Sequence, residues 1–232
     1  MNTVFFKYLG VVDFKKTWDY QESLLNSIVE TKRSNRVSKE VVETKSYLLF
    51  CQHPHVYTLG KSGDEKNLLL NKGSLKSSGS SFYKINRGGD ITYHGPGQLV
   101  IYPIFDLDNF FTDIHKYLRF LEDVVILVLK KYGVVGCRLK GATGVWVRDE
   151  KGDRKICAMG VRASRWVTMH GLAFNFSVDL SRFDSIVPCG ITDKSVTSLD
   201  VEVGKPLVFE EILSDFKKSF KTIFQIKLKP LL

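Results

Sequence analysis

The sequence predicts a mixed α/β (α+β) fold, a single domain in which a mixed sheet is packed with helices. Short apolar segments recur along the chain between glycine, proline and polar residues, which is typical of strands. A few longer segments carry apolar residues at three- and four-residue steps, which is typical of helices packed on a sheet. Because 44 % of the 232 residues are hydrophobic, one large core can form, and we expect residues 1–232 to make one domain.

The first part of the chain predicts a strand, a long helix and two short strands. The first strand is expected at Thr3–Leu9. The segment Asp13–Glu30 is amphipathic, and its first residue is an aspartate suited to cap a helix. Short apolar strands follow at Ser46–Gln52 and Val56–Leu59. The stretch Asn71–Ser81 is rich in serine, glycine and lysine, which predicts a mobile surface loop.

The rest of the chain predicts further strands and two helices. The apolar residues of Phe209–Phe224 recur at helical steps and predict a stripe that faces the core. The segment Asp113–Tyr132 has the length and apolar content of a helix packed on a sheet. The remaining strands are expected at Phe82–Asn86, Leu99–Ile104, Gly144–Arg148, Lys155–Ala163 and Gly171–Phe176.

Composition indicates the cellular compartment of this protein. The longest uninterrupted apolar run is Val124–Leu129, far short of the roughly 20 residues of a membrane span, and the amino terminus has no signal-like segment. We therefore expect a cytoplasmic protein without membrane association. The four cysteines show neither Cys-x-x-Cys spacing nor the density of a disulfide scaffold, which predicts thiols in a reducing compartment.

The net charge of +9 favours acidic partners through long-range steering of association. Nucleic acids and acidic proteins both carry the required charge. The sequence has no helix-turn-helix pattern, zinc-finger spacing or aromatic RNA-binding signature, so we expect no nucleic-acid partner.

A glycine-rich run at Arg87–Gln98, followed by the strand-like Leu99–Pro103, is the strongest signal of a functional site. It holds four glycines and one proline in twelve residues, interleaved with polar side chains. Such a backbone can turn sharply and approach a ligand closely. The alternative is an elaborate loop between two strands.

Cys189 and Lys155 are candidates for chemistry. Cys189 lies between a proline and a glycine, just before Thr192–Ser195, which resembles a helix start whose backbone N–H groups would favour a thiolate. An inert buried cysteine is the alternative. Lys155 opens a predicted strand, where lysine is ordinarily a solvated edge residue. If it points into a pocket, desolvation would lower its pKa and make it a general base.

A metal site is not expected. Cys51, His53 and His55 alternate and would share one side of a regular strand, but Pro54 argues against a regular strand. No further histidine or cysteine lies at a compact spacing. Cys51, Cys137 and Cys157 lie in apolar, strand-like stretches and are interpreted as structural.

The run from Arg87 to Pro103 closely resembles the signature of the lipoyl(octanoyl) transferases. Further segments match that family in order, and together they cover nearly the whole chain. They are His53–Gly60, Thr143–Val147, Lys155–Arg162, His170–Asn175 and Pro188–Ile191.

The resemblance implies a fold similar to the catalytic domain of biotin- and lipoate-protein ligases. It implies an acyltransferase that moves an octanoyl group from the phosphopantetheine thioester of acyl carrier protein to a lysine of a lipoyl domain, the first step of endogenous protein lipoylation. The recipients would be 2-oxoacid dehydrogenase E2 subunits and the glycine cleavage H protein. No cofactor is implied, in agreement with the absence of a phosphate-binding Gly-x-x-x-x-Gly-Lys-Ser/Thr loop, and a monomer is expected.

The same resemblance assigns residue roles. Cys189 would be the nucleophile that carries the acyl group, and Lys155 would lower its pKa and move protons. Small residues in the acyl pocket would leave room for an eight-carbon chain, and His94 would orient rather than catalyse. The implied substrate-binding residues are Arg87, Gly88, Gly89, Asp90, Ile91, Thr92, Tyr93, His94, Ala158, Met159, Gly160, Gly171, Leu172 and Ala173.

Two departures from the family pattern and two rival functions remain. His55 stands where a second proline is expected, and residues 151–153 lengthen the turn before Lys155. One rival function is an ATP-dependent lipoate- or biotin-protein ligase, against which Cys189 and the lack of an additional carboxy-terminal domain argue. The other is a non-catalytic binder of acyl carrier protein or nucleic acid, which would require Cys189 and Lys155 to lie far apart.

Overall fold

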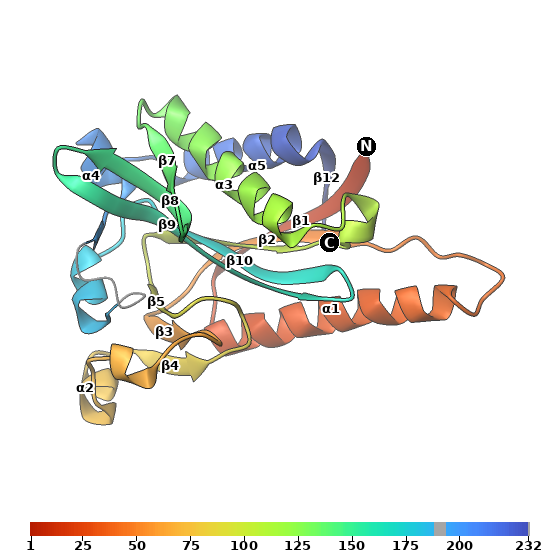
Figure 1. Cartoon of the computed structure of the whole chain (residues 1–232), viewed down its shortest axis with the longest axis horizontal. Coiled ribbons are helices and arrows are strands. Elements are labelled where there is room, and N and C mark those ends of the chain that lie inside the picture. Colours follow the sequence, from red (N-terminus) through yellow and green to blue (C-terminus); the bar gives the residue numbers. More distant parts are fainter. Residues whose placement is uncertain (188–193, 232) are drawn as a thin grey trace.

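The protein folds around one large mixed sheet with helices on both faces (Figure 1). The computed structural model describes residues 1–187 and 194–231. The helices are α1 (Phe14–Asn35), α2 (Lys72–Ser77), α3 (Ile114–Lys131), α4 (Leu199–Val203) and α5 (Phe209–Phe224), with short 3-10 helices at Glu65–Asn67, Leu107–Asn109 and Leu180–Ser185. The strands are β1 (Asn2–Val11), β2 (Ser46–Gln52), β3 (Val56–Leu59), β4 (Ser81–Lys84), β5 (Ile91–His94), β6 (Gln98–Ile104), β7 (Gly136–Leu139), β8 (Ala142–Asp149), β9 (Gly152–Ser164), β10 (Val167–Asn175), β11 (Ser195–Val196) and β12 (Ile226–Pro230).

The strands form two sheets. The large sheet has the order β12-β1-β2-β6-β10-β9-β8-β7, with β11 paired to β9, and the small sheet has the order β4-β3-β5. The pairs β1–β12 and β1–β2 are parallel, whereas β2, β6, β10, β9, β8 and β7 pair antiparallel in succession. The α/β class and the mixed sheet predicted from the sequence are therefore confirmed.

The large sheet separates two hydrophobic cores. In Figure 1, α3 and α5 lie on one face of the sheet and α1 lies on the other. The α5 stripe predicted from the sequence is buried against the sheet, since Ile212, Phe216 and Phe220 are fully buried and Phe216 contacts the rings of Phe50 and Phe174. On the other face, α1 packs through Leu25, Ile28 and Val29. Asp13 caps α1 as predicted, because its side chain accepts a hydrogen bond from the Lys16 backbone N–H.

Three local predictions differ from the structure. The stretch predicted as a mobile loop, Asn71–Ser81, contains the helix α2, which Asn71 caps by accepting a hydrogen bond from the Ser74 N–H. Local side-chain capping outweighs the weak helix propensity of serine and glycine there. The glycine-rich run is not only a loop, since it contains β5, which pairs with β3. Ser195 and Val196 form β11 rather than a first helical turn, because they pair with β9, and α4 begins only at Leu199.

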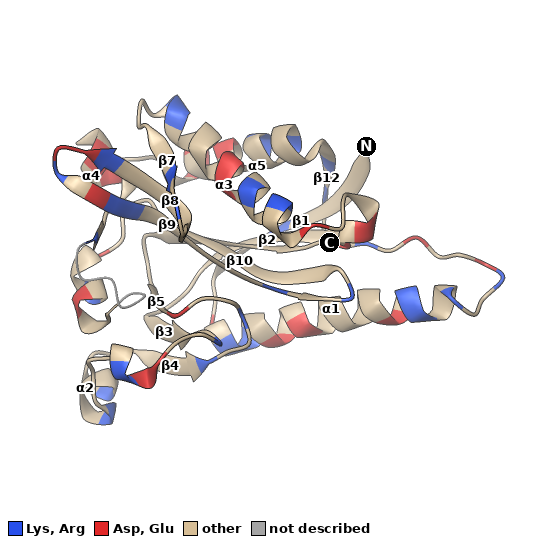
Figure 2. Ribbon diagram, viewed as in Figure 1, with Lys and Arg blue, Asp and Glu red and all other residues tan. Residues whose placement is uncertain are grey.

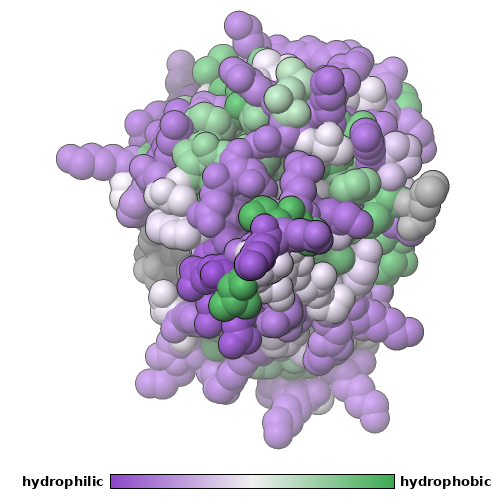
Figure 3. Space-filling model, turned by 90° about the vertical axis from the view of Figure 1, so that its right-hand side faces the viewer, coloured by the Kyte–Doolittle hydropathy of each residue, from purple (hydrophilic) through white to green (hydrophobic). Residues whose placement is uncertain are grey.

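The basic residues are distributed over several elements rather than gathered in one arm (Figure 2). Several are paired with carboxylates, as where Lys32 contacts the buried Asp106 at 2.6 Å and the exposed Asp108 at 2.7 Å. The surface at the end of the molecule where α1 finishes is mainly hydrophilic, with small separate hydrophobic groups (Figure 3). Within the described ranges, no helix is long and apolar enough to cross a membrane.

Candidate active site

A cavity of about 460 Å³ lies beside the sheet where β5, β6, β9 and β10 meet the glycine-rich run. Its lining includes Lys155 and thirteen of the fourteen predicted substrate-binding residues. Tyr93 is the exception, since its buried ring packs against Tyr57 and Phe183 and its hydroxyl contacts His55 Nδ1 at 2.6 Å. Motifs far apart in the sequence therefore come together around one hollow of the size that holds small ligands.

A bulge in β9 turns Lys155 toward this cavity. Val145 pairs with Cys157 and Trp146 pairs with Lys155, so β9 holds one extra residue, Ile156, at this point. In a regular strand Lys155 would face the side opposite to Ala158 and Gly160. The extra residue brings all three to the same cavity, and the Lys155 Nζ lies 4.6 Å from the centre of the Trp146 ring.

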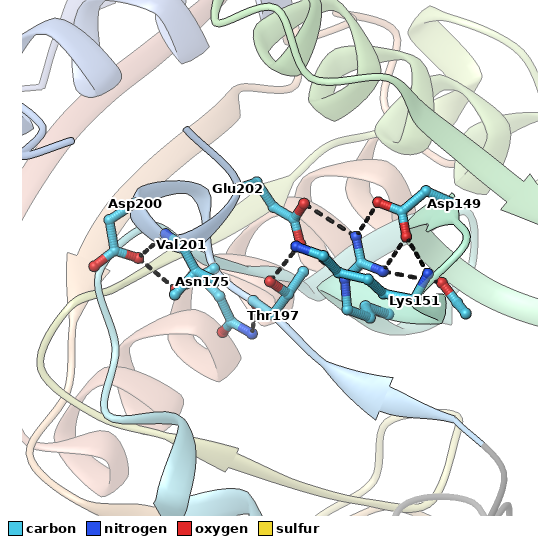
Figure 4. A network of polar contacts seen from close by, with 10 residues as sticks. Asp149, Lys151, Asn175, Thr197, Asp200, Val201 and Glu202 are labelled. Atoms are coloured by element: carbon cyan, nitrogen blue, oxygen red, sulfur yellow. Dashed lines mark hydrogen bonds and ion pairs between the residues drawn. The ribbon is translucent and has the colours of Figure 1, made fainter. Parts of the chain in front are cut away.

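The turn before Lys155 is tight despite its added residues. Asp149 pairs with Gly152 across the β8–β9 hairpin. Arg154 is held by Asp149 at 2.7 Å and by Glu202 of α4 at 3.0 Å, and Glu202 also accepts a hydrogen bond from the Thr197 hydroxyl (Figure 4). Hydrogen bonds from Arg154 lower the pKa of Asp149 to about 2. This network fixes the residue next to Lys155 and joins the hairpin to β11 and α4.

Gly160 and Gly171 in the cavity wall allow segments of the backbone to pack closely and do not create open space. A Cβ atom at Gly171 would lie 2.2 Å from the Ile101 carbonyl oxygen, and one at Gly160 would lie 2.7 Å from the Gly88 carbonyl oxygen. Both residues line the cavity, as predicted. The reason given for them was wrong, because these two glycines do not leave room for the acyl chain. The side that a side chain would occupy is already filled by protein backbone.

The variant Gly171→Ala is expected to lose about 1–3 kcal/mol of unfolding free energy, because the added methyl group overpacks a site bounded by the Ile101 carbonyl. Urea unfolding followed by circular dichroism measures this loss. The matched control is Gly73→Ala in α2, where the nearest atom to the added Cβ lies at 3.3 Å. Equal stability of the two variants would contradict this packing argument.

Three buried histidines lie in or beside the cavity, and all are held neutral. Burial lowers the pKa of His94 and of His170 to about 3 and that of His53 to about 4. For His94 and His170, the guanidinium of Arg87 lowers the pKa further. A histidine with so low a pKa does not take up a proton near neutral pH, so His94 is suited to orient other groups and not to act as a general base.

A chain of buried hydrogen bonds connects His94 to the strand that follows the Cys189 segment. His94 Nδ1 donates to Gln98 Oε1 at 2.8 Å, and Gln98 Nε2 donates to Asn175 Oδ1 at 2.9 Å. Asn175 Nδ2 donates to the Thr197 carbonyl at 2.9 Å, and the Thr197 N–H donates to the Lys155 carbonyl at 3.0 Å. Sequence reasoning did not identify Gln98 and Asn175 as site residues. The available signal was a polar residue at the end of each of two largely apolar segments, Gln98 before Leu99–Ile104 and Asn175 after Gly171–Phe174.

Cys189 lies outside the described residues. Ile186 lies shortly before this segment and Val196 shortly after it, and both line the cavity. The expected helix start after Cys189 is wrong for its described part, since Ser195 belongs to β11. Ser195 therefore does not contribute to a helix whose dipole would favour the Cys189 thiolate.

The other cysteines lie in the strands, as interpreted from the sequence. Cys51 and Cys157 are buried, and burial raises the pKa of each thiol. His53 Nε2 lies 3.5 Å from Cys51 Sγ, whereas His55 contacts Tyr93. In the part of the chain that the structure describes, no three potential ligands gather as a metal site.

Comparisons with known proteins agree with the motifs. Residues 13–221 match the family model of the lipoyl protein ligase A/B catalytic domain. An octanoyltransferase of Christiangramia forsetii is 58 % identical over 223 residues, which cover 95 % of each chain. An octanoyltransferase of Flavobacterium johnsoniae is 59 % identical over 222 residues, which cover 95 % of this chain and 96 % of that protein.

Solved structures of lipoate-protein ligases share the fold. The bipartite ligase of Thermoplasma acidophilum superposes with a TM-score of 0.69 at 16 % identity, over 99 % of this chain and 86 % of that chain. A lipoate-protein ligase A bound with ATP gives a TM-score of 0.67 at 16 % identity, over 99 % and 88 %. The fold alone does not separate ligases from transferases. On the strength of its close octanoyltransferase relatives, the chain belongs to the lipoyl protein ligase A/B catalytic-domain family as an octanoyltransferase, an acyltransferase of protein lipoylation.

Proposed function

We propose that the octanoyl group reaches this enzyme as a thioester on the phosphopantetheine arm of acyl carrier protein and passes through a thioester on Cys189. The acceptor is the lysine of a lipoyl domain, in 2-oxoacid dehydrogenase E2 subunits and in the glycine cleavage H protein. Lys155 moves the protons of both steps. The observation that carries this proposal is the position of Lys155 in the cavity wall, beside the strand β11 that follows the Cys189 segment.

In the first step, the Lys155 amine takes the thiol proton of Cys189. The thiolate attacks the octanoyl carbonyl, a new C–S bond forms, and the C–S bond to the carrier arm breaks. The departing pantetheine thiolate takes the proton from the Lys155 ammonium and leaves as a thiol. The acyl-enzyme and a free carrier thiol result, and Lys155 is again neutral.

In the second step, the neutral amine of the acceptor lysine attacks the Cys189 thioester. Lys155 accepts a proton from the attacking nitrogen, an amide bond forms, and the Cys189 thiolate leaves. Proton transfer from Lys155 restores the thiol. Exchange between thioesters is nearly isoenergetic and formation of an amide from a thioester is downhill. The proposed cycle therefore needs no ATP, metal or other cofactor.

Charge and thiol chemistry support the proposed partners and compartment. Acyl carrier proteins and lipoyl domains are typically acidic, and the chain has a net charge of +9. Cys51, Cys137 and Cys157 are free thiols, which fits a reducing compartment such as the cytoplasm.

Incubation with octanoyl acyl carrier protein, followed by intact-mass measurement, tests this proposal. The wild type is expected to gain one octanoyl group within seconds to minutes and to lose it when a lipoyl domain is added. The adduct is expected on Cys189 after peptide mapping. Absence of the adduct, or a requirement for ATP, would contradict the proposal.

The control variants separate Cys189 from the other thiols. Cys189→Ala is expected to form no octanoyl adduct, whereas Cys137→Ala is expected to form as much adduct as the wild type. Cys137 is the matched control because it is the half-exposed thiol among the described cysteines. Octanoylation of Cys189→Ala at the wild-type rate would remove this residue from the mechanism.

A further inference from the structure

The edge of β9 that faces the cavity has a gap in its strand pairing. On one edge β9 pairs with β10 from Cys157 to Ser164. On the other edge β8 pairs with β9 as far as Cys157, and the next backbone contact is the hydrogen bond from the Gly88 N–H to the Val161 carbonyl at 2.9 Å. Between these two contacts, the stretch from Ala158 to Gly160 has no strand partner on this edge among the described residues.

The backbone of Met159 points into this gap. Ser164 pairs with Val167 across the two-residue turn Arg165–Trp166, in which both residues have positive φ. Closing pairs of such turns are hydrogen-bonded, and hydrogen-bonded and non-hydrogen-bonded pairs alternate along antiparallel strands. Counting from Ser164, the N–H and C=O of Val161 and of Met159 point away from β10. The bond from Gly88 to the Val161 carbonyl agrees with this direction.

The gap lies where the cavity opens to solvent. Met159 lines the cavity and is half-buried, whereas Leu172, its partner on β10, is buried. Gly88, Gly89 and Thr143 also line the cavity, and all three are exposed. Met159, with its N–H donor and C=O acceptor, therefore lies in the cavity wall among exposed residues.

We propose that Met159 N–H and C=O bind a secondary amide of the pantetheine arm of the acyl donor. The Met159 N–H donates to the amide carbonyl, and the Met159 carbonyl accepts from the amide N–H, as in one rung of a sheet. This inference rests on the proposed function, because it takes the thioester-linked arm as the substrate. The arm is a thin, extended chain with two secondary amides. The gap offers one N–H donor and one C=O acceptor without a strand partner among the described residues, which matches one of these amides.

A strand of the acceptor protein fits this gap less well. Pairing with a folded strand needs several consecutive open positions, whereas β8 and Gly88 occupy the edge on both sides of Met159. The two occupants act in different half-reactions. The donor arm affects formation of the octanoyl-enzyme, and an acceptor strand affects its discharge.

The first experiment changes the donor and leaves the enzyme intact. S-octanoyl-pantetheine is compared with two analogues, in each of which one amide N–H is replaced by an ester oxygen. For the wild type, kcat/KM for octanoyl-enzyme formation is expected to fall about fivefold to tenfold with one analogue and less than twofold with the other. The rate at which each donor reacts with a small thiol in solution is measured as well, and each kcat/KM is divided by this rate. Values within twofold for all three donors would overturn the inference.

The second experiment removes the Met159 N–H. Met159→Pro lacks this donor, and proline is tolerated at an edge position whose N–H is outside the ladder. Met159→Leu changes the side chain and keeps the N–H. With S-octanoyl-pantetheine, kcat/KM for Met159→Pro is expected to be about tenfold below that for Met159→Leu, and the amide-to-ester discrimination is expected to shrink. If Met159→Pro does not fold, the comparison of the three donors with the wild-type enzyme decides whether the inference holds.

The outcomes distinguish this inference from the proposed function. No octanoyl-enzyme from any donor, including octanoyl acyl carrier protein, would refute the proposed function. Formation of octanoyl-enzyme at equal rates from all donors would leave the function standing and overturn the role of Met159. An effect of Met159→Pro confined to transfer from preformed octanoyl-enzyme to the lipoyl domain would assign the gap to the acceptor and also overturn the inference.

Discussion

Lys155→Ala is expected to lower kcat for octanoyl transfer by about 10²–10⁴-fold without unfolding the protein, because the side chain supplies proton transfer while its backbone bonds remain. Lys155 lines the cavity, and its backbone carbonyl accepts from the Thr197 N–H, which alanine preserves. The rate of octanoylation of a lipoyl domain, followed by mass spectrometry, measures the loss. Unchanged circular dichroism would show that the fold persists.

Lys151→Ala is the matched control for the loss of one lysine side chain. Lys151 lies at the exposed tip of the β8–β9 hairpin, and its side chain does not line the cavity. Transfer by this variant is expected at the wild-type rate. An arginine at this position stays protonated at neutral pH and cannot accept the thiol proton, so Lys155→Arg is expected to remain strongly impaired. Normal transfer by Lys155→Ala would exclude this residue from proton transfer.

The elements with strong periodicity could be predicted from the sequence. The α5 stripe, the Asp13 cap and the strands Ser46–Gln52 and Val56–Leu59 all form as expected, since local pattern and tertiary packing favour the same structure there. The strand β11 and the helix α2 were not predicted. β11 is two residues long and owes its conformation to pairing with Arg154 and Lys155 of β9, which lie 41 residues earlier in the chain.

Most residues that line the cavity could be predicted from their motifs, but the geometry that positions them could not. Motif matches place Lys155 and Ala158 in one segment without indicating the bulge at Ile156 that turns both toward one cavity. The gap at Met159 likewise depends on where the β8–β9 pairing stops and on Gly88, which lies far from both strands in sequence. The alternation of apolar and polar residues in a strand does not show where an extra residue forms a bulge. It also does not show which segment pairs with a given strand edge.

The three buried histidines are expected to make the protein markedly less stable below pH 6. In the unfolded chain a histidine has a pKa of about 6.5. In the folded protein, burial lowers the pKa of His53 to about 4 and the pKa of His94 and of His170 to about 3. Between these values only the unfolded state binds the protons, so the unfolding free energy falls as the pH is lowered.

The expected slope is about 4 kcal/mol per pH unit between pH 6 and pH 5, at about 1.4 kcal/mol for each histidine. Urea unfolding at closely spaced pH values measures it, and most carboxylates stay ionised in this range. His170→Asn is expected to lower the slope by about one third, and asparagine suits the positive φ of 58° at this position. His115→Gln on the exposed side of α3 is the matched control and is expected to leave the slope unchanged.

An unfolding free energy that stays constant from pH 7 to pH 5 would show that these rings become protonated in the folded protein. His94 would then be available as a general base and would compete with Lys155 for the proton-transfer role.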